Sequence, residues 1–262
     1  MNDNLVSIVM NCHNGEKYLE ESVQSILNQD YKNWELIFFD NQSDDRSLSI
    51  IKNFKDSRIK IFKSEKKLSL YNARNHAINK VNGDLISFLD TDDKWDKFFL
   101  KKLLKALIDS NFDLVYSKFF LVDENKKKKY INVKNFLPSG YITQYLLSSY
   151  NLGIIAVLFK KKIFENKKFN NSYEIIGDFD FFIESSINYK FFAVQEPLAF
   201  YRIHNDNITK KKLELYKQEL EDWIKRKNNF YNKNYNLNKL KFFLFKMRIK
   251  CIINKIKNFM DR

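Results

Sequence analysis

The sequence predicts an α/β protein with a mostly parallel central sheet covered by helices. Over about the first 100 residues, apolar runs typical of strands alternate with apolar residues at helical spacing. Such alternation implies right-handed crossovers and therefore parallel strands. Three of these strands also end in polar residues. Ligands of open parallel sheets bind beyond the carboxyl ends of the strands, so these polar ends predict a binding site at one edge of the sheet.

The elements of the first half follow from this alternation in order. An apolar run ends at Asn11, and the turn at Asn14-Gly15 precedes apolar residues at helical spacing from Tyr18 to Leu27. The polar cluster from Asp40 to Asp45 then precedes a second helical pattern. Residue by residue, we expect strands over 5–10, 34–39, 59–62 and 85–89, and helices over 18–27, 48–54 and 70–81.

The pattern is looser in the second half, and no internal repeat occurs. A chain of 262 residues can form one large domain, or one domain with an appendage. We expect strands over 114–122, 154–159 and 191–201, a turn over 123–129, helices over 141–150 and 178–188, and two or three helices from 211 onward.

Three carboxylates follow the fourth strand within four residues, at Asp90, Asp92 and Asp93. Carboxylates at this density repel one another unless water or a cation neutralises them. Oxygen-only ligands suit a hard ion such as Mg²⁺ or Mn²⁺, which typically bridges a protein to phosphate oxygens. The alternative is that Asp92 or Asp93 simply caps a helix that begins at Trp95.

Composition limits the class of protein and its compartment. Two distant cysteines, Cys12 and Cys251, argue against a disulfide framework or a zinc site and fit a reducing compartment. No run of about 18 apolar residues occurs, so we expect no membrane-spanning helix and a cytoplasmic protein. The net charge of +14 leaves open a basic nucleic-acid-binding protein, although the basic residues concentrate at 126–129 and in the last 50 residues.

Several segments, taken together in order, resemble family 2 glycosyltransferases. Residues 6–19 and 25–37 are similar to the opening strand, turn, helix and second strand of that family. Four shorter motifs add to the resemblance: Ala73-Arg74-Asn75, Asp90-Thr91-Asp92-Asp93 (the DXD motif), Ile176-Gly177-Asp178-Phe179-Asp180 and Tyr201-Arg202-Ile203-His204. The resemblance covers about residues 5–205.

The resemblance implies a GT-A fold, Rossmann-like, with a C-terminal helical extension. It divides the chain into a glycosyltransferase domain over 1–205 and a basic extension over 206–262. Within the domain, 1–110 would bind the nucleotide sugar and 111–205 the acceptor. The implied enzyme is a hexosyltransferase that uses Mn²⁺ or Mg²⁺ and most often a UDP-sugar. Its acceptor would be a hydroxyl of a glycan or lipid-linked saccharide, in bacterial surface-polysaccharide synthesis.

The resemblance also implies roles for individual residues. The implied donor-binding residues are Asn11, His13, Asp40, Asn41, Arg74, Asp90 and Asp92, and the implied metal ligands are Asp92, Asp93 and His204. Asp178 is the implied general base, with Asp180 as the second candidate. A base opposite the leaving group implies a single displacement, which inverts the anomeric carbon. Each residue also has an ordinary structural alternative, such as a helix cap for Asp178 or turn chemistry at the strand ends.

The chain departs from the family pattern at several positions. His13 stands where most members have an aromatic residue, usually tyrosine, and Asn41 where most have a second acid. Gly177 stands where a glutamate is common. No Gln-x-x-Arg-Trp motif occurs, which argues against a processive polysaccharide synthase. The first two departures leave the identity of the nucleotide open.

The tail leaves two interpretations open. Apolar residues recur there at near-helical spacing among many lysines: Leu240, Phe243, Leu244, Met247, Cys251, Ile252, Ile256 and Phe259. One interpretation is an amphipathic helix in peripheral contact with an anionic membrane, at the inner face of the cytoplasmic membrane. The other is a helix packed on the catalytic domain. A sugar nucleotidylyltransferase also remains open as a function, although the loop after the first strand has only one glycine, Gly15.

Overall fold

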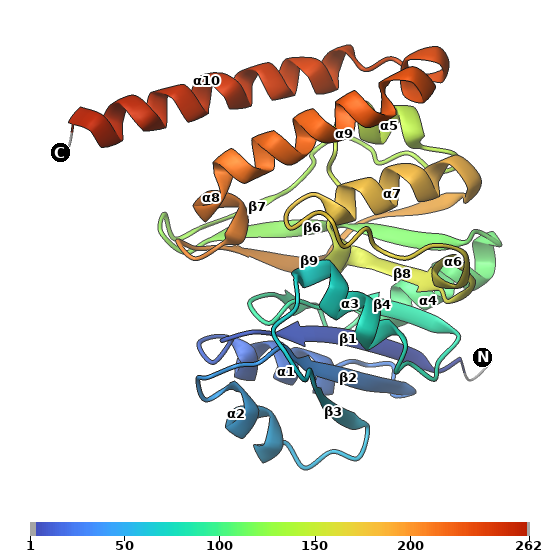
Figure 1. Cartoon of the computed structure of the whole chain (residues 1–262). Coiled ribbons are helices and arrows are strands. Elements are labelled where there is room, and N and C mark those ends of the chain that lie inside the picture. Colours follow the sequence, from blue (N-terminus) through green and yellow to red (C-terminus); the bar gives the residue numbers. More distant parts are fainter. Residues whose placement is uncertain (1–3, 261–262) are drawn as a thin grey trace.

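The computed structural model describes residues 4–260, without the side chains of 209, 210 and 257–260. Within this part of the chain, nine strands form one curled sheet in the order β3-β2-β1-β4-β8-β6-β9-β5, and β7 pairs with β6 at its side. Helices lie on both faces of the sheet, as Figure 1 shows. The predicted α/β class with C-terminal helices is therefore confirmed.

The first half of the chain follows the predicted alternation. Its elements are β1 (Val6–Cys12), α1 (Leu19–Leu27), β2 (Trp34–Asp40), α2 (Ser47–Asn53), β3 (Ile59–Lys63), α3 (Leu70–Ile78), β4 (Leu85–Phe88), β5 (Lys94–Trp95) and α4 (Phe99–Ser110). The strands β1 to β4 pair in parallel, with β1 between β2 and β4. The chain steps from β1 outward to β3 and then returns to β4 on the other side of β1. The carboxyl ends of β1 and β4 therefore flank the point where strand order reverses, which is the usual ligand position in such sheets.

The second half extends the sheet with strands of mixed direction. Its elements are β6 (Leu114–Asp123), β7 (Lys128–Ile131), α5 (Thr143–Ser148), a 3₁₀ turn at Ile154–Ala156, β8 (Val157–Lys160), α6 (Lys162–Asn166), α7 (Gly177–Asn188), β9 (Phe191–Ile203), α8 (Ile208–Lys211), α9 (Leu213–Asn234) and α10 (Asn238–Met260). β8 pairs antiparallel with β4 and β6, whereas β6 and β9 run parallel. The sheet is thus continuous from the first half into the second.

Three local predictions were wrong. Trp95 does not begin a helix: it lies in β5, which pairs with β9, and α4 begins only at Phe99. Asp92 and Asp93 are therefore not caps of a helix that starts at Trp95. The strand expected over 154–159 begins only at Val157. Residues 128–131, at the end of the expected turn, form β7 and pair with β6 as a hairpin.

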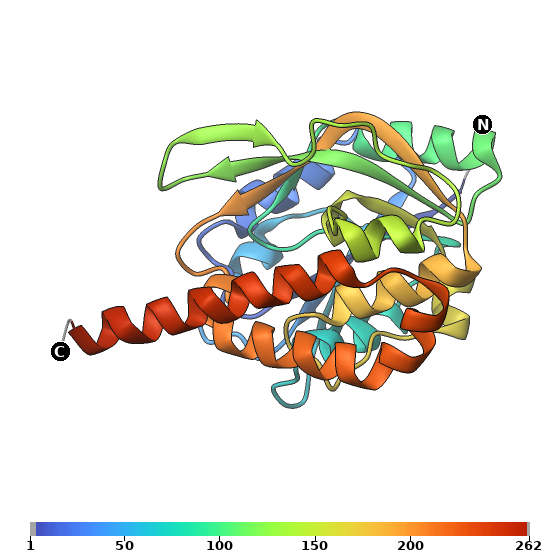
Figure 2. The same ribbon diagram turned by 90° about the horizontal axis from the view of Figure 1, so that it is seen from above.

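The C-terminal helices α9 and α10 form an outer layer beside α7 and α5 (Figures 1 and 2). Leu220 and Trp223 of α9 are buried, and so are Leu240 and Leu244 of α10. The interpretation of the tail as packed on the domain is correct for this face of α10; Phe259 lies outside the described side chains. None of the described helices combines the length and hydrophobicity that a membrane span requires.

A buried carboxylate ties the amino ends of the central strands together. Glu35 on β2 is 3% exposed, and it accepts hydrogen bonds from the Ser7 hydroxyl on β1 and from the backbone and side-chain amides of Asn82. Lys60 on β3 forms an ion pair with it at 2.6 Å. Burial alone would raise the pKa of Glu35, but Lys60 and the hydrogen bonds outweigh burial and lower it to about 2.

Replacing Glu35 by Gln should therefore destabilise the fold in a pH-dependent way. The lowered pKa means that the carboxylate stabilises the folded state fully above the ordinary glutamate pKa and that this contribution is lost as the pH falls toward 2. We expect the free energy of unfolding to fall by about 2–3 kcal/mol at pH 7, and the difference from wild type to shrink toward pH 2. Urea unfolding at several pH values measures this, with Glu20→Gln at an exposed position as the control. A difference that does not vary with pH would contradict the proposed role.

Candidate functional site

The carboxyl ends of β1 and β4 bring two of the predicted polar clusters together. Asn11 lies in β1, and its side-chain nitrogen and oxygen are both buried without a hydrogen-bond partner. Asp90 follows β4, and its Oδ1 forms an ion pair with Arg74 Nη2 at 2.7 Å. Because a buried amide without partners is unfavourable, Asn11 marks a place where a polar ligand would be stabilised.

Helix α3 links these strand ends to the second half of the chain. Its Arg74 side chain is 3% exposed and pairs with Asp90. One turn earlier, the Tyr71 hydroxyl lies 2.8 Å from the Ile175 carbonyl oxygen and 3.2 Å from Asp178 Oδ1. Asp90 and Asp178, 88 positions apart in the sequence, are thus held around two neighbouring side chains of one helix.

Asp178 is partly exposed at the start of α7, where it accepts a hydrogen bond from the Phe179 backbone amide at 2.8 Å. Burial raises the pKa of Asp178, although Arg74, the Phe179 amide and Tyr71 act in the opposite direction. A helix N-terminus alone would have made this carboxylate a weaker base. The net upward shift instead makes it a stronger proton acceptor than an ordinary aspartate.

The glycine at position 177 is explained by the Tyr71 ring. A Cβ at Gly177 would lie 2.4–2.6 Å from three carbons of that ring, which no side chain could occupy. The Tyr71 ring therefore fills the space in which the glutamate common in the family would begin. The Tyr71 ring thus lies against Gly177 while its hydroxyl contacts Asp178.

Asp92 is paired with His204, which follows β9. The His204 Nε2 atom lies 2.9 Å from Asp92 Oδ2, and the Asp206 backbone amide donates to His204 Nδ1 at 3.1 Å. Because Nδ1 accepts that hydrogen bond, Nε2 carries the proton and donates it to Asp92. Burial and the neighbouring Asp90 raise the pKa of Asp92. His204 thus orients Asp92, which remains partly exposed toward the strand ends.

Asp93 is turned toward β9 and is 2% exposed. Its Oδ1 accepts the Arg202 backbone amide at 2.7 Å, whereas its Oδ2 is buried without a hydrogen-bond partner. Burial, and after it the charges of Asp92 and Asp90, raise the pKa of Asp93 well above its usual range. The three predicted acids therefore lie in one place, and Asp92 and Asp93 hold their protons more tightly than ordinary aspartates.

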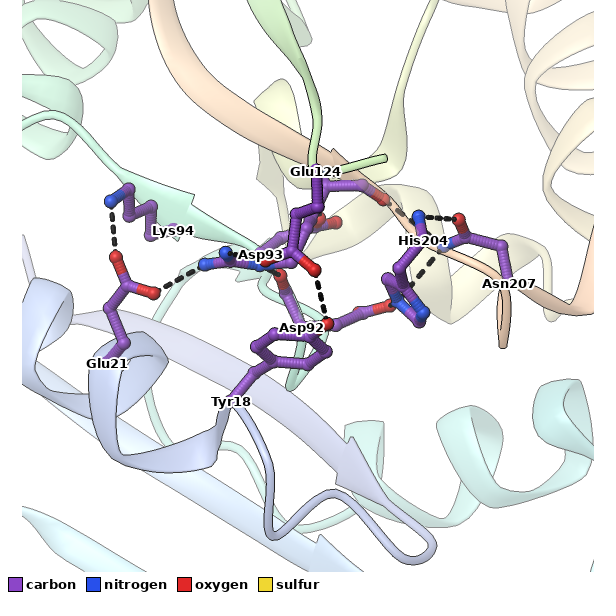
Figure 3. Close-up of polar contacts among 9 residues, drawn as sticks. Tyr18, Glu21, Asp92, Asp93, Lys94, Glu124, His204 and Asn207 are labelled. Atoms are coloured by element: carbon purple, nitrogen blue, oxygen red, sulfur yellow. Dashed lines mark hydrogen bonds and ion pairs between the residues drawn. The ribbon is translucent and has the colours of Figure 1, made fainter. Parts of the chain in front are cut away.

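A network that sequence reasoning missed surrounds this acidic corner. Arg202 donates from Nε to the Asp92 carbonyl oxygen at 2.8 Å and pairs with Glu124 at 2.7 Å and with Glu21 at 2.5 Å. The Tyr18 hydroxyl donates to Glu124 at 2.6 Å, as Figure 3 shows. Glu21 lies 181 positions from Arg202, so no local pattern could reveal the pair. Arg202 itself lies in the recognised tyrosine-arginine-x-histidine element.

The residues predicted to contact the nucleoside are spread over a wider area than the acidic residues Asp90, Asp92 and Asp93. Asp40 is fully buried at the end of β2, and the amide of Asn41 is bound to the Leu68 backbone, with its Nδ2 donating to the carbonyl and its Oδ1 accepting the amide, both at 2.9 Å. His13 is exposed, and its Nε2 lies 2.7 Å from Lys67 Nζ. In this structure Asn41 holds the loop around Leu68, and His13 and Lys67 form the surface near the strand ends. Their contacts with a nucleoside stay predictions.

Helix α9 fixes the segment that precedes Asp178. The Glu219 carboxylate accepts three consecutive backbone amides, from Glu174, Ile175 and Ile176, at 2.6, 2.9 and 3.1 Å. Asp180 is buried and accepts from Trp223 Nε1 at 2.8 Å. Asp180 is thus engaged in packing, which leaves Asp178 as the carboxylate that faces α3.

The residues present fit a divalent cation in part. Burial and then the neighbouring Asp90 raise the pKa of Asp92, and Asp93 Oδ2 is an orphaned buried oxygen, so a cation would stabilise both carboxylates. The described residues contain no group of three acids, histidines or cysteines already placed as a complete ligand set. A metal here would therefore need further oxygen ligands from a substrate, as Mg²⁺ and Mn²⁺ commonly take from phosphates.

Comparisons with known proteins match this chain to one family. A family model described as glycosyl transferase family 2 matches residues 7–180. An uncharacterized glycosyltransferase of Methanocaldococcus jannaschii is 33% identical over 253 residues, which cover 92% of this chain and 85% of that protein. The UDP-Glc:alpha-D-GlcNAc-diphosphoundecaprenol beta-1,3-glucosyltransferase WfgD of Escherichia coli is 31% identical over 163 residues, which cover 62% of this chain and 63% of that protein.

Among solved structures, the chain is similar to S. aureus TarS 1-349 in complex with UDP-GlcNAc. The TM-score is 0.67 at 15% sequence identity, over 90% of this chain and 68% of that chain. At this identity the likeness concerns the fold alone, and it extends beyond β9 into the C-terminal helices.

Proposed function

Because this chain belongs to glycosyl transferase family 2, we propose that it transfers a sugar from a nucleotide sugar to an acceptor hydroxyl with inversion at the anomeric carbon. We further propose that the donor is a UDP-sugar and that the reaction is a step in bacterial surface-polysaccharide synthesis. The observation that carries the proposal is the arrangement around α3. Arg74 contacts Asp90 and Tyr71 contacts Asp178, so the proposed donor-binding acid and the proposed general base lie around the same helix.

The donor would bind at the carboxyl ends of β1, β2 and β4. Asn11, His13, Asp40 and Asn41 form the nucleoside side of the proposed site, with Arg74 and Asp90 toward the sugar. The orphaned amide of Asn11 supports this placement, because a bound nucleotide would supply the partners it lacks. We assign residues 1–110 to donor binding and 111–205 to acceptor binding.

Asp92 is the proposed direct ligand of Mn²⁺ or Mg²⁺, and the donor diphosphate would supply further ligands. A bound divalent ion supplies Lewis-acid stabilisation of the leaving diphosphate. His204 orients Asp92 through its Nε2–H, and Asp93 secures the strand end to β9. Direct binding of the metal by Asp93 and by His204 stays a prediction. His204 could bind a metal through Nε2 only if that atom gave up the proton that it donates to Asp92.

Asp178 is the proposed general base. It would remove the proton from the acceptor hydroxyl as that oxygen attacks the anomeric carbon, and a raised pKa suits this role. The acceptor we propose is a glycan or a lipid-linked saccharide, in keeping with the diphosphoundecaprenol-linked acceptor in the name of the Escherichia coli relative. Such an acceptor places the chain at the cytoplasmic face of the membrane, where we propose peripheral contact through the basic extension, residues 206–262.

A turnover panel tests this function. The protein is incubated with UDP-, GDP- and dTDP-sugars and a polyprenyl-diphosphate-linked saccharide, with Mn²⁺ or with EDTA. We expect release of the nucleoside diphosphate from a UDP-sugar that depends on both acceptor and Mn²⁺. If the protein binds nucleotides but transfers no sugar of the panel, it is a nucleotide-binding protein, and this result would contradict the transferase proposal.

Replacing Tyr71 by Phe should shift the pH dependence of the transfer rate, so that activity on the acidic side is lost at a higher pH than in wild type. The Tyr71 hydroxyl lowers the pKa of Asp178, so its removal lets that pKa rise further. Only the deprotonated carboxylate accepts a proton, so the variant loses activity at a higher pH than wild type as the pH falls. Rate profiles between about pH 4 and 8 measure the shift. A pH dependence that stays in place or moves to lower pH would contradict the role of Tyr71.

A further inference from the structure

Helix α10 carries two apolar faces, and only one of them packs on the protein. The packed face consists of Leu240, Leu244, Met247 and Cys251, each 5–6% exposed. The second face, called the outer stripe here, consists of Phe242, Phe245, Ile249, Ile252, Ile253 and Ile256, which are 43–58% exposed. Singly exposed apolar residues are ordinary on a protein surface, but six on one helix form a continuous patch that calls for a partner.

The two faces lie on opposite sides of the helix. At about 100° per residue, the outer stripe follows the spacing i, i+3, i+7, i+10, i+11, i+14 and is centred opposite the packed face. Figures 1 and 2 show α10 as the outermost helix of the layer, alongside α9, so the stripe lies on the outside of the molecule. Packing within the described chain therefore accounts for one face and leaves the other uncovered.

Basic residues flank the outer stripe on both sides. Lys241, Arg248 and Lys255 follow one edge at intervals of seven, and Lys239, Lys246 and Lys250 follow the other. The sequence from Asn238 to Met260 contains no aspartate or glutamate. An apolar stripe between two cationic edges is the pattern of helices that lie in the interface of an anionic bilayer, where lysines reach the head groups and the apolar side chains enter the acyl region.

We propose that the outer stripe of α10 lies in the surface of an anionic membrane, with the helix parallel to the bilayer plane. The inference rests on the membrane contact proposed above and names the surface that makes it. A second copy of the chain would bring an equally basic, acid-free helix against the first, so charge favours lipid over self-association. Insertion would be shallow, since α10 is too rich in charge to span a bilayer.

This placement puts the membrane on the outer side of α10, which Figure 1 shows above α9 and α7, with the sheet and β1 below them. In Figure 1 the C-terminal end of α10 extends past α8, toward the side of the molecule to which β1 runs. The carboxyl end of β1 is where Asn11 and the acidic corner lie. A saccharide anchored in the same bilayer would be held near the protein, which raises its effective concentration.

Vesicle binding by the full chain tests the proposal. Wild-type protein is sedimented with phosphatidylcholine vesicles with and without phosphatidylglycerol, and compared with the variant Ile249→Glu/Ile253→Glu. We expect binding only with phosphatidylglycerol, weakening with salt, and at least about tenfold less binding by the variant. The matched control is Ile61→Glu/Ile108→Glu, which adds the same charges at exposed isoleucines on β3 and α4 and should bind vesicles like wild type.

Separate readouts keep the outcomes distinct. Circular dichroism and UDP binding confirm that each variant is folded, and they report on the proposed function independently of membrane binding. As a second probe, the emission of Ile253→Trp should shift to shorter wavelength on adding anionic vesicles, whereas Ile108→Trp should not. Equal vesicle binding by the two double variants would overturn the proposal. So would a wild-type dimer that binds no vesicles and dissociates in Ile249→Glu/Ile253→Glu, because a second copy would then cover the stripe.

Discussion

Replacing Asp178 by Asn is expected to reduce sugar transfer at least about a hundredfold while donor binding survives. The substitution removes the proton-accepting charge but keeps the Oδ1 atom, which accepts the Phe179 amide and lies near the Tyr71 hydroxyl. The local structure should therefore persist. Initial rates with saturating donor and acceptor measure the effect, and the Michaelis constant for the donor should change little, because only the transition state uses the lost group.

Asp180→Asn is the matched control, two positions along the same helix. Asp180 Oδ1 accepts from Trp223 Nε1, and an asparagine oxygen at the same place can still accept that hydrogen bond. We therefore expect its transfer rate to stay within a few-fold of wild type. The opposite outcome, in which Asp178→Asn is active and Asp180→Asn is not, would assign the base to Asp180.

Replacing Asp92 by Asn should weaken metal binding and lower the rate of metal-dependent transfer. The acidic corner holds Asp90, Asp92 and Asp93 together. Asp90 and Asp92 are both partly exposed, and Asp92 is the one that His204 orients. Loss of its charge should raise the Mn²⁺ concentration needed for half-maximal transfer at least about tenfold, and lower the rate at saturation. Metal titration of the transfer rate measures both effects.

Asp84→Asn provides the control for this charge change. Asp84 is exposed and directly precedes β4, at the opposite end of the strand from the acidic corner. Its replacement removes one negative charge from the same strand without touching the site, so the Mn²⁺ requirement should not change. A metal requirement that shifts equally in both variants would reflect overall charge rather than a site at Asp92.

The sequence could predict the first half of the fold because its elements are locally determined. The strands β1, β2 and β4 are apolar runs that end in polar residues, and strand order in such sheets directs those ends to one edge. This logic brought Asn11, Asp40 and Asp90 to one region. It did not by itself choose among sugar transfer, nucleotidyl transfer and nucleic-acid binding. The ordered motifs that resemble family 2 glycosyltransferases favoured the first, and the family model confirms that family.

The contacts that shape the site could not be predicted, because they join residues far apart in sequence. Asp92 and His204 are 112 positions apart, and Tyr71 and Asp178 are 107. The helix expected at Trp95 failed for the same reason: pairing with β9 overrides the local pattern. Long-range pairing of this kind leaves no periodic signal in the sequence.

The C-terminal extension shows a further limit of prediction from the sequence. The apolar residues of the tail form one set in the sequence, whereas in the structure Leu240 and Ile256 lie on opposite faces of α10, one packed and one exposed. Glu219 and Trp223 of α9 also hold the segment around Asp178. The extension is therefore connected to the candidate site by buried polar contacts, which its lysine-rich composition alone does not reveal.

The central claim is that the carboxyl ends of β1 and β4 bind the nucleoside diphosphate of a sugar donor with a divalent ion. Calorimetric titration of the wild-type protein with UDP, in Mn²⁺ and then in EDTA, tests it most directly. The account predicts saturable binding of one UDP per chain in Mn²⁺ that weakens at least about tenfold in EDTA and in Asp92→Asn. Absence of binding by folded protein in Mn²⁺, or binding of equal strength in EDTA and in the variant, would contradict the account.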